Sequence, residues 1–131
     1  MPSSLPSLAG NPPALPDRWS DPAASALLPA ETVLAWLEID LDERLQFSPG
    51  LLLLTEGRLL AIDAGQAVRE WPLAAALQLQ HHDHAGVGTL ELVDDRRRLA
   101  VWRYTLGRNL AALRLIDEFG LQRDSRIAGH P

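Results

Sequence analysis

The sequence contains no cysteine and no lysine, and each absence excludes a class of function. Without cysteine the chain forms no disulfide, offers no thiolate to a metal and has no cysteine nucleophile. Without lysine it has no Walker A loop, in which a lysine contacts the β- and γ-phosphates. All 12 basic side chains are arginines, and 17 acidic residues bring the formal net charge to −5. A negative domain repels nucleic acid and anionic lipid, so either partner would require a local basic patch.

Long apolar runs are also missing. No uninterrupted run, including that at residues 51–54, is longer than five residues, whereas a membrane-spanning helix needs roughly 18 consecutive apolar residues. The N-terminal stretch lacks the basic region and continuous apolar core of a secretion signal, because prolines interrupt it. We therefore expect a cytoplasmic protein.

The length of 131 residues predicts one folded domain of about 100 residues. Residues 1–22 hold six of the ten prolines, which predicts a flexible arm because proline fixes φ and removes an amide donor. Within this arm Trp19 either docks on the domain or stays exposed. We expect the domain over residues 31–120 and a frayed tail over residues 121–131.

Strand patterns fill the first half of the predicted domain. Residues 32–42 alternate apolar and polar side chains, which indicates a half-buried strand with Asp40 on its polar face. The turn signals Pro49-Gly50 and Glu56-Gly57 lie seven residues apart, too close for an ordinary helix between them. Residues 51–63 therefore read as a hairpin that is apolar on both faces.

The second half adds further strands and one helix. Short strands are predicted near residues 67–71, 76–80, 89–93 and 98–104, which makes about seven in all. A helix is then predicted at about residues 108–119, where apolar residues recur every three or four positions and Gly120 stands at the expected end. The apolar residues that define this predicted face are Leu106, Leu110, Leu113, Ile116 and Phe119.

The hairpin also carries a family resemblance. The stretch LLLLTEGRLLAID resembles the L-T-x-x-R-L hairpin of bacterial pleckstrin-homology (PH)-like domains, with Thr55 and Arg58 at the motif positions. The resemblance covers residues 31–120. It implies a mainly β fold with one C-terminal α-helix, in which a bent antiparallel sheet or small barrel of about seven strands is closed by the amphipathic helix.

A longer stretch resembles part of a transporter. The segment WPLAAALQLQHHDHAGVGTLELVDDRRRLAVWRYTLGRNLAAL is similar to the region ahead of the membrane and ATPase portions of proteobacterial ABC transporters, some associated with cyanophycin metabolism. This resemblance implies a cytosolic N-terminal accessory or regulatory domain, tethered to the inner membrane through a parent protein and contacting its transmembrane or ATPase portions. ATP binding would belong to the parent protein.

Three histidines form the one cluster with metal-ligand chemistry: His81, His82 and His84, with Asp83 between them. Imidazole and carboxylate together suit zinc or nickel, and alternate residues of an extended strand point to one side. Adjacent residues rarely complete a tetrahedral site by themselves, however, and no further ligand cluster is available. A solvated turn is the preferred interpretation, and we predict no metal and no cofactor.

Arginines at Arg96, Arg97 and Arg98 offer an anion-binding patch, such as a site for a lipid headgroup. Asp94 and Asp95 lie directly beside them, and a charged, solvated β-turn explains the same residues without a ligand. Binding to anionic headgroups at the membrane is therefore the alternative function, behind binding to another protein.

Aromatic residues supply the candidates for a protein-contact patch: Trp36, Trp102 and Tyr104. Catalysis has no support, because the acidic pairs Asp40/Asp42 and Asp94/Asp95 read as surface charges and no nucleophile elbow is present. The sequence thus predicts a non-catalytic domain that acts through protein contacts.

Overall fold

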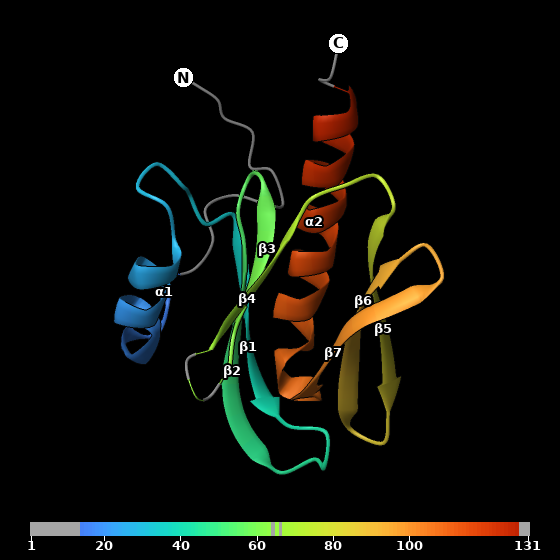
Figure 1. The fold of residues 1–131 in the computed structure, drawn as a ribbon. Coiled ribbons are helices and arrows are strands. Elements are labelled where there is room, and N and C mark those ends of the chain that lie inside the picture. Colours follow the sequence, from blue (N-terminus) through green and yellow to red (C-terminus); the bar gives the residue numbers. More distant parts are fainter. Residues whose placement is uncertain (1–13, 64, 66, 129–131) are drawn as a thin grey trace, which may run out of the picture.

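The computed structural model describes residues 14–63, 65 and 67–128, with side chains as far as residue 125 (Figure 1). Two short helices are followed by seven strands, a helical turn and one long helix. The elements are η1 (Asp17–Trp19), α1 (Ser20–Ala26), β1 (Ala35–Leu41), β2 (Phe47–Leu54), β3 (Arg58–Ile62), β4 (Val68–Pro72), β5 (Leu77–His84), β6 (Val87–Asp94), β7 (Arg97–Thr105), η2 (Leu106–Arg108) and α2 (Asn109–Ala128). The predicted class, mainly β with one C-terminal helix, is confirmed.

The seven strands form one antiparallel sheet in the order β4-β3-β2-β1-β7-β6-β5. β2 pairs with β1 from Ala35 to Leu41, with a register shift between Ile39 and Leu41. On its other side β1 meets β7 only where Leu41 lies opposite Arg103. Within the described residues β4 and β5 are the outer strands, so the sheet is open. Of the two predicted forms, the small barrel is wrong.

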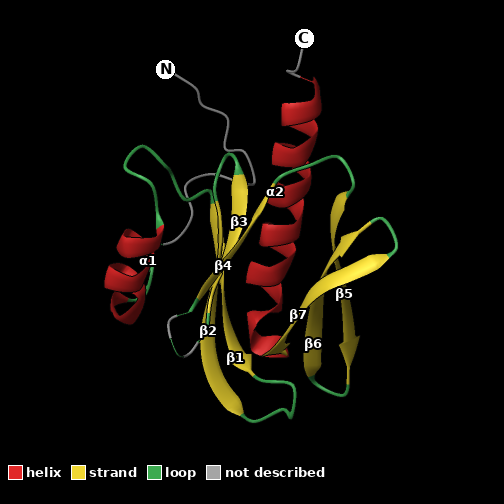
Figure 2. Ribbon diagram, viewed as in Figure 1, coloured by secondary structure: helices red, strands yellow, loops and turns green. Residues whose placement is uncertain are grey.

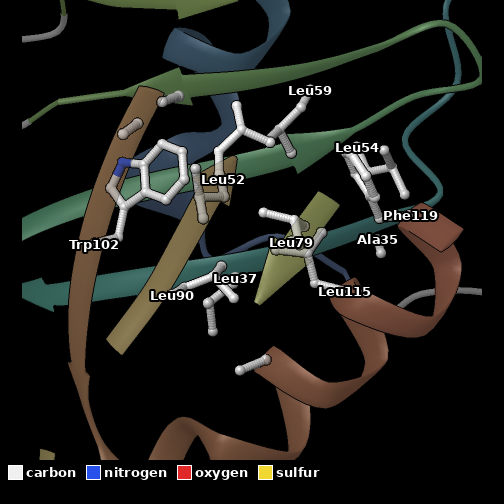
Figure 3. Close-up of a cluster of buried hydrophobic side chains, with 14 of the residues drawn as sticks. Ala35, Leu37, Leu52, Leu54, Leu59, Leu79, Leu90, Trp102, Leu115 and Phe119 are labelled. Atoms are coloured by element: carbon white, nitrogen blue, oxygen red, sulfur yellow. The ribbon is translucent and has the colours of Figure 1, made fainter. Parts of the chain in front are cut away.

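The main core lies between the two halves of the sheet, where α2 packs (Figure 2). Leu115 and Phe119 extend from α2 toward the strands, with Phe119 close to Ala35 and Leu54 (Figure 3). Both helix side chains are almost fully buried. Burial of a side chain of this size contributes roughly 1.5–3 kcal/mol, so this contact fixes α2 against β1 and β2.

A second core covers the opposite face of β2 and β3, beneath α1 (Figure 2). Neighbouring residues of a strand point to opposite faces, so Leu52 and Leu54 belong to the main core. Leu51 and Leu53 belong to the second core, together with Trp19. The predicted hairpin is apolar on both faces because two cores enclose it.

The N-terminal segment corrects the predicted flexible arm. Residues 14–22 are part of the fold, whereas residues 1–13 lie outside the described residues. Pro22 falls in the first turn of α1, where a missing amide hydrogen costs no helical hydrogen bond. Trp19 is buried in the second core, which decides between the two predicted positions of this side chain.

Helix α2 corrects the predicted helix end and the predicted frayed tail as far as residue 128; residues 129–131 lie outside the described residues. It continues through Gly120, which does not have the positive φ of a terminating glycine, and ends at Ala128. Beyond Gly120, the guanidinium of Arg123 donates to the main-chain oxygen of Leu77 at 2.9 Å. This hydrogen bond anchors the additional turns to β5, a contact that the local sequence pattern does not reveal.

The inward face of α2 also differs from the prediction. Leu106, Leu110 and Leu113 were expected to face the core, but all three are exposed. Ala112 and Leu115 are buried instead, along with Phe119. The helix carries two adjoining apolar stripes, and its packing against β1 and β5 decides which one is buried.

The two glycines near residue 87 have separate structural roles. Ala85 and Gly86 connect β5 to β6 with positive φ values of 51° and 84°, as a tight hairpin turn requires. Gly88 lies opposite Tyr104 across β6 and β7, and a Cβ at this position would come within 2.3 Å of the tyrosine ring. Gly86 therefore forms the turn, and Gly88 makes room for a core aromatic residue.

Candidate functional site

A groove of about 760 Å³ runs between β1 and α2. Residues 34–38, directly before and within the start of β1, form one wall of the groove. Residues of η2 and α2 form the other wall. The lining residues are Leu34, Ala35, Trp36, Leu37, Glu38, Gly107, Arg108, Leu110, Ala111, Arg114, Ile116, Asp117, Glu118, Gly120, Leu121 and Asp124. It is the larger of the two hollows described here, and most of its lining is apolar.

One wall of the groove is an incompletely paired strand edge. β2 pairs with β1 on one side, but β7 reaches the other side only at Leu41. Among residues 14–128 as described, no strand covers the edge of β1 from Ala35 to Asp40. Backbone N–H and C=O groups on an uncovered edge readily accept another strand. The edge that lines the groove has no strand partner over these residues, although all of them except Trp36 are buried beside α2.

The other wall is a stripe along α2. Its residues recur every three or four positions, so they lie on one side of the helix. Leu110 and Leu121 are 71% and 60% exposed, although both are large apolar side chains. Exposed leucines at both ends of one groove give a docked segment apolar surface along its whole length.

Glu38 closes one end of the groove with a network of hydrogen bonds. It is only 5% exposed. The indole nitrogen of Trp19 donates to its carboxylate at 2.7 Å, Arg18 donates from Nε at 2.7 Å, and Arg108 from Nη1 at 3.2 Å. Burial by itself raises the pKa of Glu38, but the hydrogen bonds from Trp19 and Arg18 and the nearby arginine charges lower it below its ordinary value. Glu38 is therefore a structural anion.

Asp40 extends this network to the end of β7. The amide nitrogen and hydroxyl of Thr105 donate to its carboxylate at 2.9 and 2.8 Å, and Arg108 lies 3.3 Å away. Burial raises the pKa of Asp40, whereas these donors lower it below its usual value. The predicted surface charge at Asp40 is wrong, because the residue is 7% exposed and holds β1 to β7 beyond their single paired position.

The opposite end of the groove carries free charges. Arg114 and Asp117 both line it, yet neither forms an ion pair or side-chain hydrogen bond with any described residue. Glu118 accepts a hydrogen bond from Gln122 at 3.1 Å, and Asp124 pairs with its neighbour Arg123 at 3.1 Å. This end is therefore acidic and open to a further partner.

The motif residues of the hairpin have a structural role. Arg58 contacts Glu31 through two nitrogens at 2.7 Å each, and also contacts Glu70 and the main-chain oxygen of Ala26. Thr55 donates to Glu31 at 2.9 Å. The hydrogen bond from Arg58 is the largest reason that the pKa of Glu31 falls to about 2. Thr55 and Arg58 thus fasten the segment after α1 to the sheet.

The three predicted histidine ligands lie in β5, where all three are exposed. His82 faces Glu91 at 3.1 Å, and hydrogen bonds from His82 and Arg98 lower the pKa of Glu91. Among the described side chains, no three histidine, aspartate or glutamate residues gather in a way that would hold a metal ion. The histidines occupy a strand, whereas a turn was predicted; the turn begins at Ala85.

The predicted arginine patch lies at the turn between β6 and β7 and the start of β7. Arg96, Arg97 and Arg98 are all exposed, and Arg98 pairs with Glu91 at 3.1 Å. Asp95 occupies the turn with a φ of 57°. The structure places the three arginines away from the lining of either described hollow.

The aromatic candidates separate into two groups. Trp36 is half-buried, packs against the second core and lines the groove. Trp102 and Tyr104 are buried in the main core, so the prediction that they contact a partner is wrong. Burial also raises the pKa of Tyr104. They face inward because Ala100, Trp102 and Tyr104 share the face of β7 that belongs to the main core.

A smaller hollow of about 270 Å³ lies beside Trp102. The guanidinium of Arg69 lies 5.5 Å from the ring centre of Trp71 and 5.9 Å from that of Trp102. It also pairs with Asp63 at 3.4 Å. Because this cation already has three partners within the fold, the groove is the stronger candidate site.

Sequence reasoning missed most of the groove. Trp36 was predicted to contact a partner, but Leu110, Arg114, Asp117 and Leu121 were not identified as site residues. Their spacing on one side of a helix was visible in the sequence. The missing information was that β1 and β7 diverge and leave an edge beside this stripe, which depends on tertiary structure.

Comparisons with known proteins identify no relative from which a function could be inferred. A scan against protein-family models and a search of curated proteins both give no match. Within the described part of the chain, none of the helices has the length and apolar character needed to cross a membrane. The groove between β1 and α2 is thus the feature on which a function is best inferred.

Proposed function

We propose that this protein is a non-catalytic interaction domain that binds an extended segment of another protein at the groove between β1 and α2. The observation that carries the proposal is the edge of β1 that no strand pairs with before Leu41, beside an apolar helix face. An added strand gains main-chain hydrogen bonds from the edge and side-chain contacts from the groove. Glu38 and Asp40, the buried carboxylates nearby, are occupied by structural hydrogen bonds, which favours binding over catalysis.

The outer edges of the sheet are poorer sites for an added strand. β4 is short, carries Arg69 and Glu70, and ends at Pro72, which has no amide hydrogen to donate. The exposed side chains of β5 include Asp83 and three histidines. Charge and proline on an edge discourage pairing with another chain. The edge of β1 is therefore the preferred position.

The resemblance to ABC transporters suggests where the bound segment originates. The domain would act as a cytosolic accessory or regulatory unit, and its partner would be a segment of the transmembrane or ATPase portions. The seven antiparallel strands and C-terminal helix agree with the PH-like plan.

Selection of phage-displayed random peptides on the full chain tests this function. Each selected peptide is measured by fluorescence polarisation against the wild type, Leu110→Arg and Val68→Arg. Leu110 lines the groove, whereas Val68 is exposed on the outer strand β4, so the two variants carry the same change at different positions. We expect at least a tenfold loss of affinity for Leu110→Arg and little change for Val68→Arg.

Two outcomes would contradict the proposal. Peptides that bind both variants as well as the wild type would place recognition outside the groove. Co-sedimentation with anionic vesicles that is lost when Arg96, Arg97 and Arg98 are changed to alanine, with no peptide selected, would favour headgroup binding instead. A wild-type melting temperature in each variant confirms that the comparison reports binding.

A further inference from the structure

We infer that the segment bound by the groove is an aliphatic strand with a basic residue at the end nearest Leu34, an inference that rests on the proposed function. The two ends of the groove differ in available charge. Near Glu38 the charges are neutralised within the fold, whereas near Leu34 acidic side chains remain accessible. The groove therefore selects the charge of its partner as well as its extended shape.

The direction of α2 relative to β1 fixes which end is which. Arg108, directly before the helix, contacts Glu38 in the middle of β1 and Asp40 nearer the end of that strand. Phe119, three turns later, packs near Ala35 at the first residue of β1 (Figure 3). The later part of the helix, with Asp117 and Asp124, thus lies toward the beginning of β1.

The balance of free charge at that end is negative. Arg108 is already engaged by Glu38 and Asp40. The remaining charged residues of the lining are Arg114 on one side and Asp117, Glu118 and Asp124 on the other; because Asp124 already pairs with Arg123, Asp117 and Glu118 outweigh Arg114 by one negative charge. Complementary charge across an interface raises the association rate and disfavours partners of like charge. A lysine or arginine opposite Asp117 and Asp124 is the complementary choice.

The apolar part of the lining favours aliphatic side chains in the remainder of the bound segment. Leu110 and Leu121 flank the groove, with Ala111 and the small residues Gly107 and Gly120 between or beside them. Alternate side chains of an added strand would point toward this surface, and aliphatic residues would bury it. The net charge of −5 on the whole chain further favours a basic segment over a second copy of this protein.

Charge-reversal variants of the protein, titrated with synthetic peptides of different charge, test the inference. The peptides alternate valine and threonine and carry, at one end, two lysines, two glutamates or two glutamines. They are titrated by fluorescence polarisation into the wild type, Asp117→Lys/Asp124→Lys and the control Asp94→Lys/Asp95→Lys. The control changes the same charges at the turn between β6 and β7, away from the groove.

We expect the wild type to bind the lysine peptide about five- to tenfold more tightly than the glutamate peptide at low salt. Asp117→Lys/Asp124→Lys should reverse this order, and Asp94→Lys/Asp95→Lys should keep it. Equal affinity for all three peptides, with loss of binding in Leu110→Arg, would overturn the charge inference and leave the proposed function standing. Failure of Leu110→Arg to weaken any peptide would overturn both. Dimerisation of the wild type that Leu110→Arg abolishes would assign the groove to a second copy and also overturn the inference.

Discussion

The two edges of β1 differ in how completely they are paired. One edge is paired with β2 from Ala35 to Leu41, and leucines from both strands are fully buried beside it. The other edge meets β7 at one position and otherwise faces a groove with exposed leucines. A single strand thus contributes stability along one edge and offers a binding surface along the other. Substitutions on the two sides should consequently have separable effects.

The largest expected effect on stability lies on the paired side. Leu52→Ala, on β2 opposite Leu37, removes a fully buried side chain of the main core and should lower the free energy of unfolding by roughly 3 kcal/mol. Leu110→Ala, on the groove wall, should lower it by less than about 0.5 kcal/mol. Urea unfolding measures both. Similar losses in the two variants would show that the groove wall is part of the core.

An intermediate loss of stability is expected for substitution of Glu38, whose carboxylate binds both Arg18 and Arg108. Glu38→Gln leaves Arg18 and Arg108 without their shared anion, which should cost roughly 1–3 kcal/mol of stability. Glu118→Gln is the matched control, because among the described residues the Glu118 carboxylate accepts a hydrogen bond from Gln122 alone and forms no ion pair. Thermal melts compare the two variants. An unchanged melting temperature for Glu38→Gln would mean that the network does not hold the N-terminal segment.

Acid should weaken the fold through the same carboxylates. Glu31, Glu38 and Asp40 all have pKa values below their ordinary ones, that of Glu31 at about 2. Such groups stabilise the folded state above their unfolded pKa, and this contribution is lost as the pH falls through the folded pKa. We expect the Glu31 contribution to account for roughly 2 kcal/mol between about pH 5 and pH 2.

The control for this pH dependence is Glu31→Gln, because the glutamine side chain is neutral at every pH in this range and therefore does not titrate. It should be less stable than the wild type at pH 6 and show a flatter decline toward pH 2. Urea unfolding at a series of pH values measures both curves. A decline as steep as that of the wild type would contradict the assignment to the Arg58 and Glu31 pair.

Local patterns predicted the strands of this fold well, and failed where long-range packing decides the outcome. Glu56-Gly57 correctly marks the turn between β2 and β3, because glycine and the spacing of apolar runs act locally. The turn predicted at Pro49-Gly50 is wrong, because both residues lie within β2 and Gly50 pairs with Ile39 of β1. The inward face of α2 was misassigned, because Leu110 and Leu115 are equally apolar and only the sheet distinguishes them. The groove escaped prediction for the same reason, since it exists only where β1 and β7 separate.

Amide hydrogen exchange with NMR detection tests the central claim most directly. The ¹⁵N-labelled full chain is measured alone and with saturating peptide selected on it. We predict new protection for amides of β1 between Ala35 and Asp40 that face the groove, together with shifts at Leu110 and Leu121. Unchanged protection in β1, with shifts confined to Arg96, Arg97 and Arg98 or to the histidines of β5, would contradict it.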